Sequence, residues 1–144
     1  MYFDDFELNY TVEIEPAVIE KQRMLEFAER YDNIPLHTDE EYAKTTPFRK
    51  LIAPGFMSFL EVWAKYLEID LFGEELIAGK STKVEWHKPV FVDDVLTGRA
   101  VVTNLIPRNK RNGIVELTIN VQNQDGVTVI SSVTEAVVKR RNDE

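Results

Sequence analysis

Apolar and polar positions alternate along the second half of the chain in the way that half-buried strands require. One stretch places Leu117, Ile119 and Val121 between the polar residues Thr118, Asn120 and Gln122. This period of two puts one set on each face of a sheet. Together with an enrichment in Val, Ile and Thr, the pattern predicts four strands, at 75–86, 94–106, 113–122 and 127–139.

Turn residues separate the last three predicted strands. The segment 109–113 reads Asn-Lys-Arg-Asn-Gly and the segment 123–126 reads Asn-Gln-Asp-Gly. Asn, Asp and Gly tolerate the backbone conformations that tight hairpins need. The last three strands are therefore predicted to form an antiparallel meander.

The first half of the chain is predicted to be mainly helical. After a short strand at 10–15, Pro16 suits a first helical position and predicts a helix over 17–30. Thr38 and Glu41 have the spacing of a capping box, which predicts a short helix that starts there.

A longer helix is predicted from Gly55 to about Glu68. Its charges Glu61, Lys65 and Glu68 fall on one narrow stripe, and most other positions are apolar, so we expect other structure to wrap it. One buried helix with about five antiparallel strands is α+β, and a curved sheet around it would be the hot-dog arrangement. Because such a sheet leaves an edge and a face exposed, we expect a homodimer or higher homo-oligomer.

Composition narrows the class of protein. At 144 residues, with 44% hydrophobic and 29% charged, we expect a single globular domain over 1–144. The longest uncharged run, 51–60, is far below the roughly 20 residues that span a bilayer, and the acidic N-terminus is unlike a secretory signal. We therefore expect a cytoplasmic protein without membrane partners.

Charge and residue usage exclude several kinds of chemistry. The net charge of -8 disfavours nucleic acid as a partner, and a phosphorylated ligand would need a local basic patch. The absence of cysteine excludes thiolate catalysis, and two histidines make a metal site improbable. We expect neither a metal nor a cofactor.

Candidate acid–base chemistry lies between the first two predicted helices. Asp32 and His37 stand five residues apart with Pro35 stiffening the turn between them, so both side chains can face one cavity from a loop. The predicted helix start after His37 favours a neutral ring. Equally open is that Asp32 caps a turn and His37 is an ordinary surface histidine. Gly55, at the start of the long helix, offers a free N–H to a developing oxyanion.

These residues belong to a wider set of motifs. The chain has Phe27-Ala28, Asp32-x-x-Pro35-x-His37, Asp39-Glu40-Glu41-x-Ala43, Leu51-Ile52-Ala53-Pro54-Gly55, Lys88-Pro89-Val90 and Asp93-Asp94-Val95-Leu96. Between Phe27 and Leu96 this set resembles the MaoC-like (R)-specific enoyl-CoA hydratase and 3-hydroxyacyl dehydratase family. The most specific elements are the Asp-x-x-Pro-x-His core and the glycine 18 positions after the histidine.

The resemblance implies a hot-dog homodimer that reversibly adds water to a trans-2-enoyl thioester of coenzyme A or acyl carrier protein. The product would be an (R)-3-hydroxyacyl thioester, and no metal or cofactor takes part. The resemblance assigns Asp32 and His37 to the catalytic pair and the Gly55 N–H to the thioester carbonyl. Two departures stand out: Ile34 replaces a common amide residue, and Trp63 replaces a small hydroxyl residue, which would shorten the acyl pocket.

Two other functions stay open. One is a hot-dog acyl-CoA thioesterase that uses a helix carboxylate; Glu61 is the nearest candidate, but its charged stripe favours a solvated role. The other is an acyl-CoA-binding or assembly subunit without turnover.

His87 is expected to be an ordinary strand residue, and a metal held by His37 and Asp39 is improbable. Coenzyme A phosphates could contact the basic residues within 108–111, those within 139–141, or neither group. The sequence does not decide among these possibilities.

Overall fold

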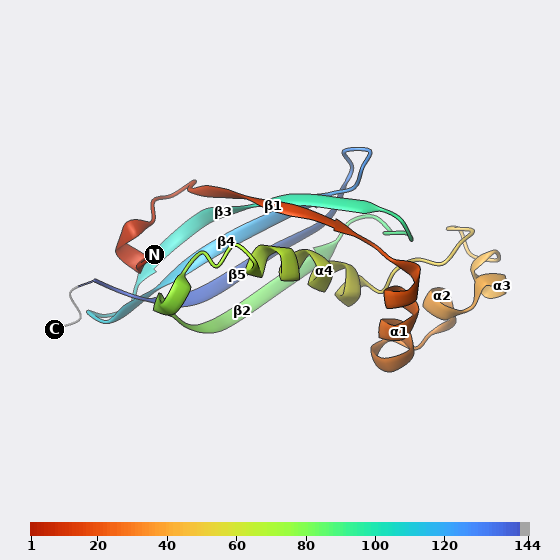
Figure 1. Ribbon diagram of the computed structural model, residues 1–144, viewed down its shortest axis with the longest axis horizontal. Coiled ribbons are helices and arrows are strands. Elements are labelled where there is room, and N and C mark those ends of the chain that lie inside the picture. The colour runs from red at the N-terminus through yellow and green to blue at the C-terminus, as the bar shows by residue number, and fades with distance from the viewer. Residues whose placement is uncertain (142–144) are drawn as a thin grey trace.

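Five antiparallel strands form one curved sheet in the computed structural model, which describes residues 1–141 (Figure 1). The strands are β1 (Thr11–Val18), β2 (Leu76–Trp86), β3 (Val95–Pro107), β4 (Asn112–Gln122) and β5 (Thr128–Lys139). Their order is β1-β3-β4-β5-β2, with β3, β4 and β5 paired as a meander. The four strands predicted for the second half are confirmed, and each bound differs by at most one residue.

The helices divide between one face and one end of the sheet. α4 (Gly55–Leu67) runs along the sheet, whereas α1 (Lys21–Tyr31), α2 (Pro35–Thr38) and α3 (Glu40–Ala43) gather beyond one end (Figure 1). Short 3-10 turns lie at Phe3–Asp5 and Gly73–Glu75. The α+β hot-dog arrangement is confirmed. No helix within residues 1–141 has the length and apolar character to cross a membrane.

The alternation in β4 decides which side chains form the core. Leu117, Ile119 and Val121 are buried, while Asn120 and Gln122 on the same strand are exposed. α4 is only half covered. Met57, Ser58, Val62 and Tyr66 are buried, but the side chains of Phe56 and Leu67 are 60% and 54% exposed. The expectation that α4 is wrapped on most sides is therefore wrong for a single chain.

Pro16 does not begin a helix. It lies in β1, where the pairing with β3 shifts register between Ile14 and Ala17, and the first helix starts only at Lys21. A proline has no N–H to give to a ladder, so a bulge on an edge strand accommodates it without losing a hydrogen bond. The predicted helix over 17–30 is thus corrected to a longer strand and a shorter helix.

The predicted capping box is also wrong. Asp39, not Thr38, caps α3, because its carboxylate accepts a hydrogen bond from the Tyr42 N–H at 3.1 Å. Thr38 is instead the last residue of α2, and its hydroxyl donates to the Ile34 carbonyl at 3.1 Å. Pro35 at the first turn starts this extra helix, so His37 lies in a helix and not in a loop.

Candidate active site

His37 and Asp32 meet at the junction of α1 and α2. Asp32 is the residue that ends α1, and His37 comes from the single turn of α2 that follows Pro35. The His37 Nε2 atom lies 3.4 Å from Asp32 Oδ2. The His37 residue is only 6% exposed, so the interpretation of an ordinary surface histidine is wrong.

A backbone contact fixes the ring of His37. Its Nδ1 lies 2.7 Å from the carbonyl oxygen of Ile52. Because a carbonyl oxygen only accepts hydrogen bonds, Nδ1 must carry a proton. In the neutral ring the lone pair is then on Nε2, the atom that faces Asp32, where it can accept a proton.

A cavity of about 520 Å³ brings Asp32, His37 and Gly55 together. It opens at the N-terminal end of α4 and is also lined by Ser58 and by the segment 86–90 that follows β2. We call it the site cavity. N–H groups in the first turn of a helix have no carbonyl one turn earlier, so Gly55 offers a donor to this space.

Trp86 explains why residue 55 is a glycine. A Cβ atom on Gly55 would lie 2.6 Å from two atoms of the Trp86 indole, closer than side-chain atoms approach. The indole also packs edge-to-face on Phe56, with 5.3 Å between ring centroids. Only a residue without a side chain fits between α4 and this ring.

The sequence analysis missed His87. It lines the site cavity directly after β2, and its Nε2 lies 2.7 Å from the Ser131 hydroxyl on β5. His87 was expected to be an ordinary strand residue, but it lies just after β2 and lines the site cavity. A signal was present in the sequence, because His87 immediately precedes the matched Lys88-Pro89-Val90 motif.

Several other predicted features lie outside the site cavity. Glu61 is half-buried and forms an ion pair with Arg23 at 3.1 Å. Ile34 is exposed and does not line the cavity. Asp39 uses its carboxylate to cap α3. Within residues 1–141, no group of three or more His, Cys, Asp or Glu residues is placed to hold a metal ion.

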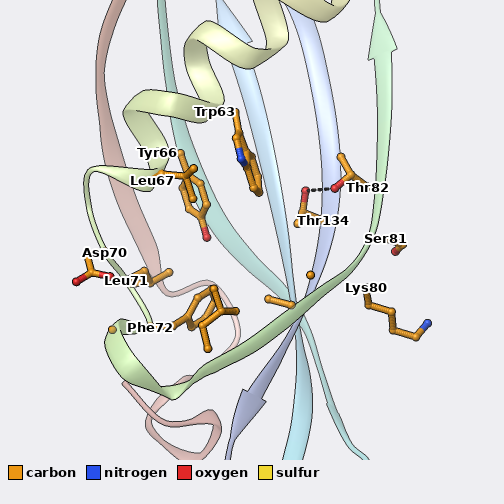
Figure 2. A pocket seen from close by; sticks show the side chains of 14 residues that line it. Trp63, Tyr66, Leu67, Asp70, Leu71, Phe72, Lys80, Ser81, Thr82 and Thr134 are labelled. Carbon is orange, nitrogen blue, oxygen red and sulfur yellow. Dashed lines mark hydrogen bonds between the residues drawn. The ribbon is translucent and has the colours of Figure 1, made fainter.

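Trp63 lines a second cavity of about 400 Å³ at the other end of α4 (Figure 2). Its indole lies against the Tyr66 ring, with 4.9 Å between centroids. Across the cavity Thr82 and Thr134 share a hydrogen bond of 3.2 Å between β2 and β5. Burial raises the pKa of Tyr66 to about 12, so this phenol is neutral over the ordinary pH range.

A curved sheet along one helix, with a buried histidine and a carboxylate beside the start of that helix, defines a hot-dog protein with an acid–base pair in its cavity. The MaoC like domain family matches residues 5–125. That match covers most of the chain, which therefore belongs to the MaoC-like family.

Individual relatives support this assignment. The uncharacterized protein YdeM of Bacillus subtilis is 26% identical over 97% of this chain and 100% of its own length. An (R)-specific enoyl-CoA hydratase of Rhodospirillum rubrum is 29% identical over 76% of this chain and 74% of its own.

Solved structures agree. A monoamine oxidase regulatory protein from Archaeoglobus fulgidus superposes with a TM-score of 0.92 at 28% identity, covering 97% of this chain and 95% of that one. The (R)-hydratase PhaJ1 from Pseudomonas aeruginosa superposes with a TM-score of 0.77 at 25% identity, covering 97% and 86%.

Proposed function

We propose that this protein is an enoyl-thioester hydratase, or 3-hydroxyacyl-thioester dehydratase in the reverse direction, with Asp32, His37 and Gly55 as its catalytic groups. The observation that carries the proposal is the contact of His37 Nε2 with Asp32 Oδ2 in a cavity that also holds the first N–H groups of α4. The hydratases among its relatives support the same reaction class.

The tautomer of the His37 ring, with its proton on Nδ1, suits water activation. With Nδ1 donating to Ile52, Nε2 is the free acceptor, and Asp32 Oδ2 is a second acceptor 3.4 Å away. A water molecule can donate one hydrogen to each atom, which orients its oxygen towards the substrate. As the oxygen bonds to the β-carbon of the enoyl thioester, Nε2 takes the released proton.

The electrons of the double bond then move toward the thioester carbonyl. The resulting enolate oxygen carries more negative charge than the ground-state carbonyl, so a fixed N–H donor at Gly55 stabilises the transition state preferentially. Protonation of the α-carbon from the Asp32–His37 pair completes the 3-hydroxyacyl thioester. Loss of water follows the same steps in reverse, and neither direction requires a cofactor. The two hydratases among the named relatives are (R)-hydratases, so we assign the (R) product.

The proposal includes a homodimer that forms along β2. Both β1 and β2 are edge strands, and both have register shifts against their neighbours, but only β1 carries a proline, Pro16, which protects an edge from pairing. β2 spans 11 residues with no proline and exposes Leu76 and Ile77. A second copy would cover this edge and the exposed apolar side of α4.

A thioesterase is a weaker alternative on the same fold. It would need a carboxylate on α4 to face the substrate, but Glu61 is engaged by Arg23 and does not line the site cavity. No other residue of α4 is acidic.

Hydration of crotonyl-CoA tests the proposal. Loss of the enoyl-thioester absorbance and release of free thiol are measured in parallel for the wild type, Asp32→Asn and His37→Gln. We expect absorbance to fall without thiol release, and each variant to lose at least about 100-fold in rate. Asp125→Asn, in the β4–β5 turn, serves as the control and should retain full activity.

Other outcomes would contradict the proposal. Thiol release would indicate hydrolysis of the thioester. Binding of acyl-CoA without turnover of short or long enoyl chains would indicate a binding or assembly subunit.

A further inference from the structure

A third cavity, which is positively charged, lies beside the site cavity. It measures about 300 Å³, and the side chains that give it charge are Lys21, Lys44, Arg49 and Lys50. Leu51, Phe91 and Val92 supply an apolar wall, and Glu40 is its one acidic residue. We call it the basic cavity. Such a concentration of cations is unexpected on a chain with a net charge of -8.

Two of these cations lack an acidic partner. Lys21 pairs with Glu40 at 2.7 Å, and Lys44 pairs with Glu41 at 2.9 Å. Within residues 1–141, no carboxylate lies within 4.0 Å of Arg49 or of Lys50. The Lys50 ammonium instead lies over the ring of Phe91, 4.2 Å from its centroid. Arg49 and Lys50 therefore leave uncompensated positive charge in the cavity.

The same two segments of chain form walls of both cavities. The Ala53 N–H donates to the Val90 carbonyl at 2.7 Å, which joins the segment 48–53 to the segment 86–92. Phe48 and Ile52 line the site cavity, whereas Arg49 to Leu51 line the basic cavity. A ligand that occupies the site cavity therefore has the basic cavity as its immediate neighbour.

The backbone at Arg49 arranges these side chains. Its φ is 67°, in the left-handed region that residues with a side chain rarely adopt. An extended chain would send successive side chains to opposite sides. The turn at Arg49 breaks this alternation, and Arg49, Lys50 and Leu51 all face the basic cavity.

A competing group of cations at the C-terminal end of β5 is neutralised. Arg140 forms an ion pair with Asp4 and Arg141 forms one with Asp5, each at 2.9 Å. The N-terminus and the end of β5 lie at the end of the sheet opposite to α1, α2 and α3 (Figure 1). These cations are thus both compensated and remote from the site cavity, and residues 142–144 lie outside the described part of the chain.

We propose that the basic cavity binds the phosphates of the coenzyme A nucleotide. The inference rests on the proposed function, because it takes a coenzyme A thioester as the substrate of the site cavity. Arg49 and Lys50 would donate charge-assisted hydrogen bonds to phosphate oxygens in the cavity that they line. The local charge also offsets repulsion between an acidic protein and a polyanionic ligand.

A pair of thioesters tests the inference. Crotonyl-CoA and crotonyl-pantetheine share the reacting group, but only the first carries the nucleotide. We expect the double variant Arg49→Met/Lys50→Met to lose about tenfold or more in kcat/KM for crotonyl-CoA, the size expected for lost charged hydrogen bonds, with crotonyl-pantetheine unchanged. The control Lys110→Met, in the β3–β4 hairpin, should change neither value.

Failure of this inference is distinguishable from failure of the proposed function. Wild-type turnover of crotonyl-pantetheine reports the hydratase chemistry without the nucleotide. If the double variant retains the wild-type preference for crotonyl-CoA, the basic cavity does not bind the nucleotide although the hydratase stands.

Calorimetry with 3′,5′-ADP tests the cavity even without turnover. Binding that the double variant loses would support the inference, and equal binding by both proteins would overturn it. A third outcome is that 3′,5′-ADP does not bind and the double variant loses activity only with carrier-protein thioesters. That outcome would assign these cations to a carrier protein and overturn the nucleotide assignment.

Discussion

The imidazole of His37 lies 3.4 Å from the carboxylate of Asp32, with its other nitrogen held by the Ile52 carbonyl at 2.7 Å. This second contact comes from the segment that leads into α4. The ring is thus oriented by the chain just before Gly55, the residue whose N–H we assign to the thioester carbonyl. Small changes at the start of α4 should therefore affect both parts of the site.

The first prediction concerns the coupling of Asp32 and His37. If one water molecule needs both groups, removing the second group after the first should cost little. We expect Asp32→Ala, His37→Ala and the double variant each to lose at least about 100-fold in kcat for crotonyl-CoA, with the double variant within a few-fold of the worse single one. Multiplicative losses would show that the residues act independently.

The second prediction concerns Gly55. An alanine there would place its Cβ 2.6 Å from the Trp86 indole, so the ring or the start of α4 must move. We expect Gly55→Ala to lower kcat by about tenfold through displacement of the N–H donor, and Gly55→Ala/Trp86→Ala to regain part of it. Asp125→Asn, in the β4–β5 turn, is again the control and should leave kcat unchanged. An unchanged kcat in Gly55→Ala would contradict this role of the backbone.

The third prediction concerns acyl chain length. Trp63 lies on α4 eight residues after Gly55 and lines the second cavity together with Tyr66. We expect Trp63→Ala to raise kcat/KM for an eight-carbon enoyl-CoA by about tenfold relative to crotonyl-CoA, since apolar pockets discriminate by about that factor per fitted group. Asp125→Asn, in the β4–β5 turn, should leave the ratio unaltered. The idea fails if both variants show the wild-type ratio.

The fourth prediction concerns pH. Burial raises the pKa of Tyr66 from 10.0 to about 12, so the folded state favours the neutral phenol. This contribution to the free energy of unfolding is present below pH 10 and is lost as the pH rises through about 12. Urea unfolding at a series of pH values should show this loss in the wild type and a smaller one in Tyr66→Phe. The difference in ultraviolet absorbance between the wild type and Tyr66→Phe reports the ionisation of Tyr66. Ionisation of this phenol near pH 10 in the folded protein would contradict the prediction.

The fifth prediction concerns assembly. Light scattering at micromolar concentration should give about twice the chain mass of 16.7 kDa. Ile77→Asp, on the free edge strand β2, should shift the mass toward one chain, because a dimer would bury its 48% exposed residue and desolvate the carboxylate. Leu8→Asp, an exposed apolar position before β1, is the matched control. A wild-type monomer would remove the homodimer from the proposal.

Local pattern determined much of this fold. The alternation in β4, the turn residues around Gly113 and Gly126 and the apolar length of α4 act between neighbours in the chain, so the sequence predicted these elements nearly to the residue. The spacing of Asp32, Pro35 and His37 likewise indicated the candidate pair without knowledge of its surroundings.

Long-range packing decided the rest. Pro16 fits a bulge only because β1 pairs with β3, about 80 residues away in the chain, and a proline in isolation is equally compatible with a helix start. His87 meets Ser131 across the β2–β5 pair, and the basic cavity joins Lys21 to Phe91. Periodicity constrains which face a residue takes, whereas the identity of its distant neighbours depends on how the elements pack. The sequence alone therefore determined the strands of the second half, α4 and the candidate pair, and only the tertiary structure decided the bounds of the first helices and the cavities around the pair.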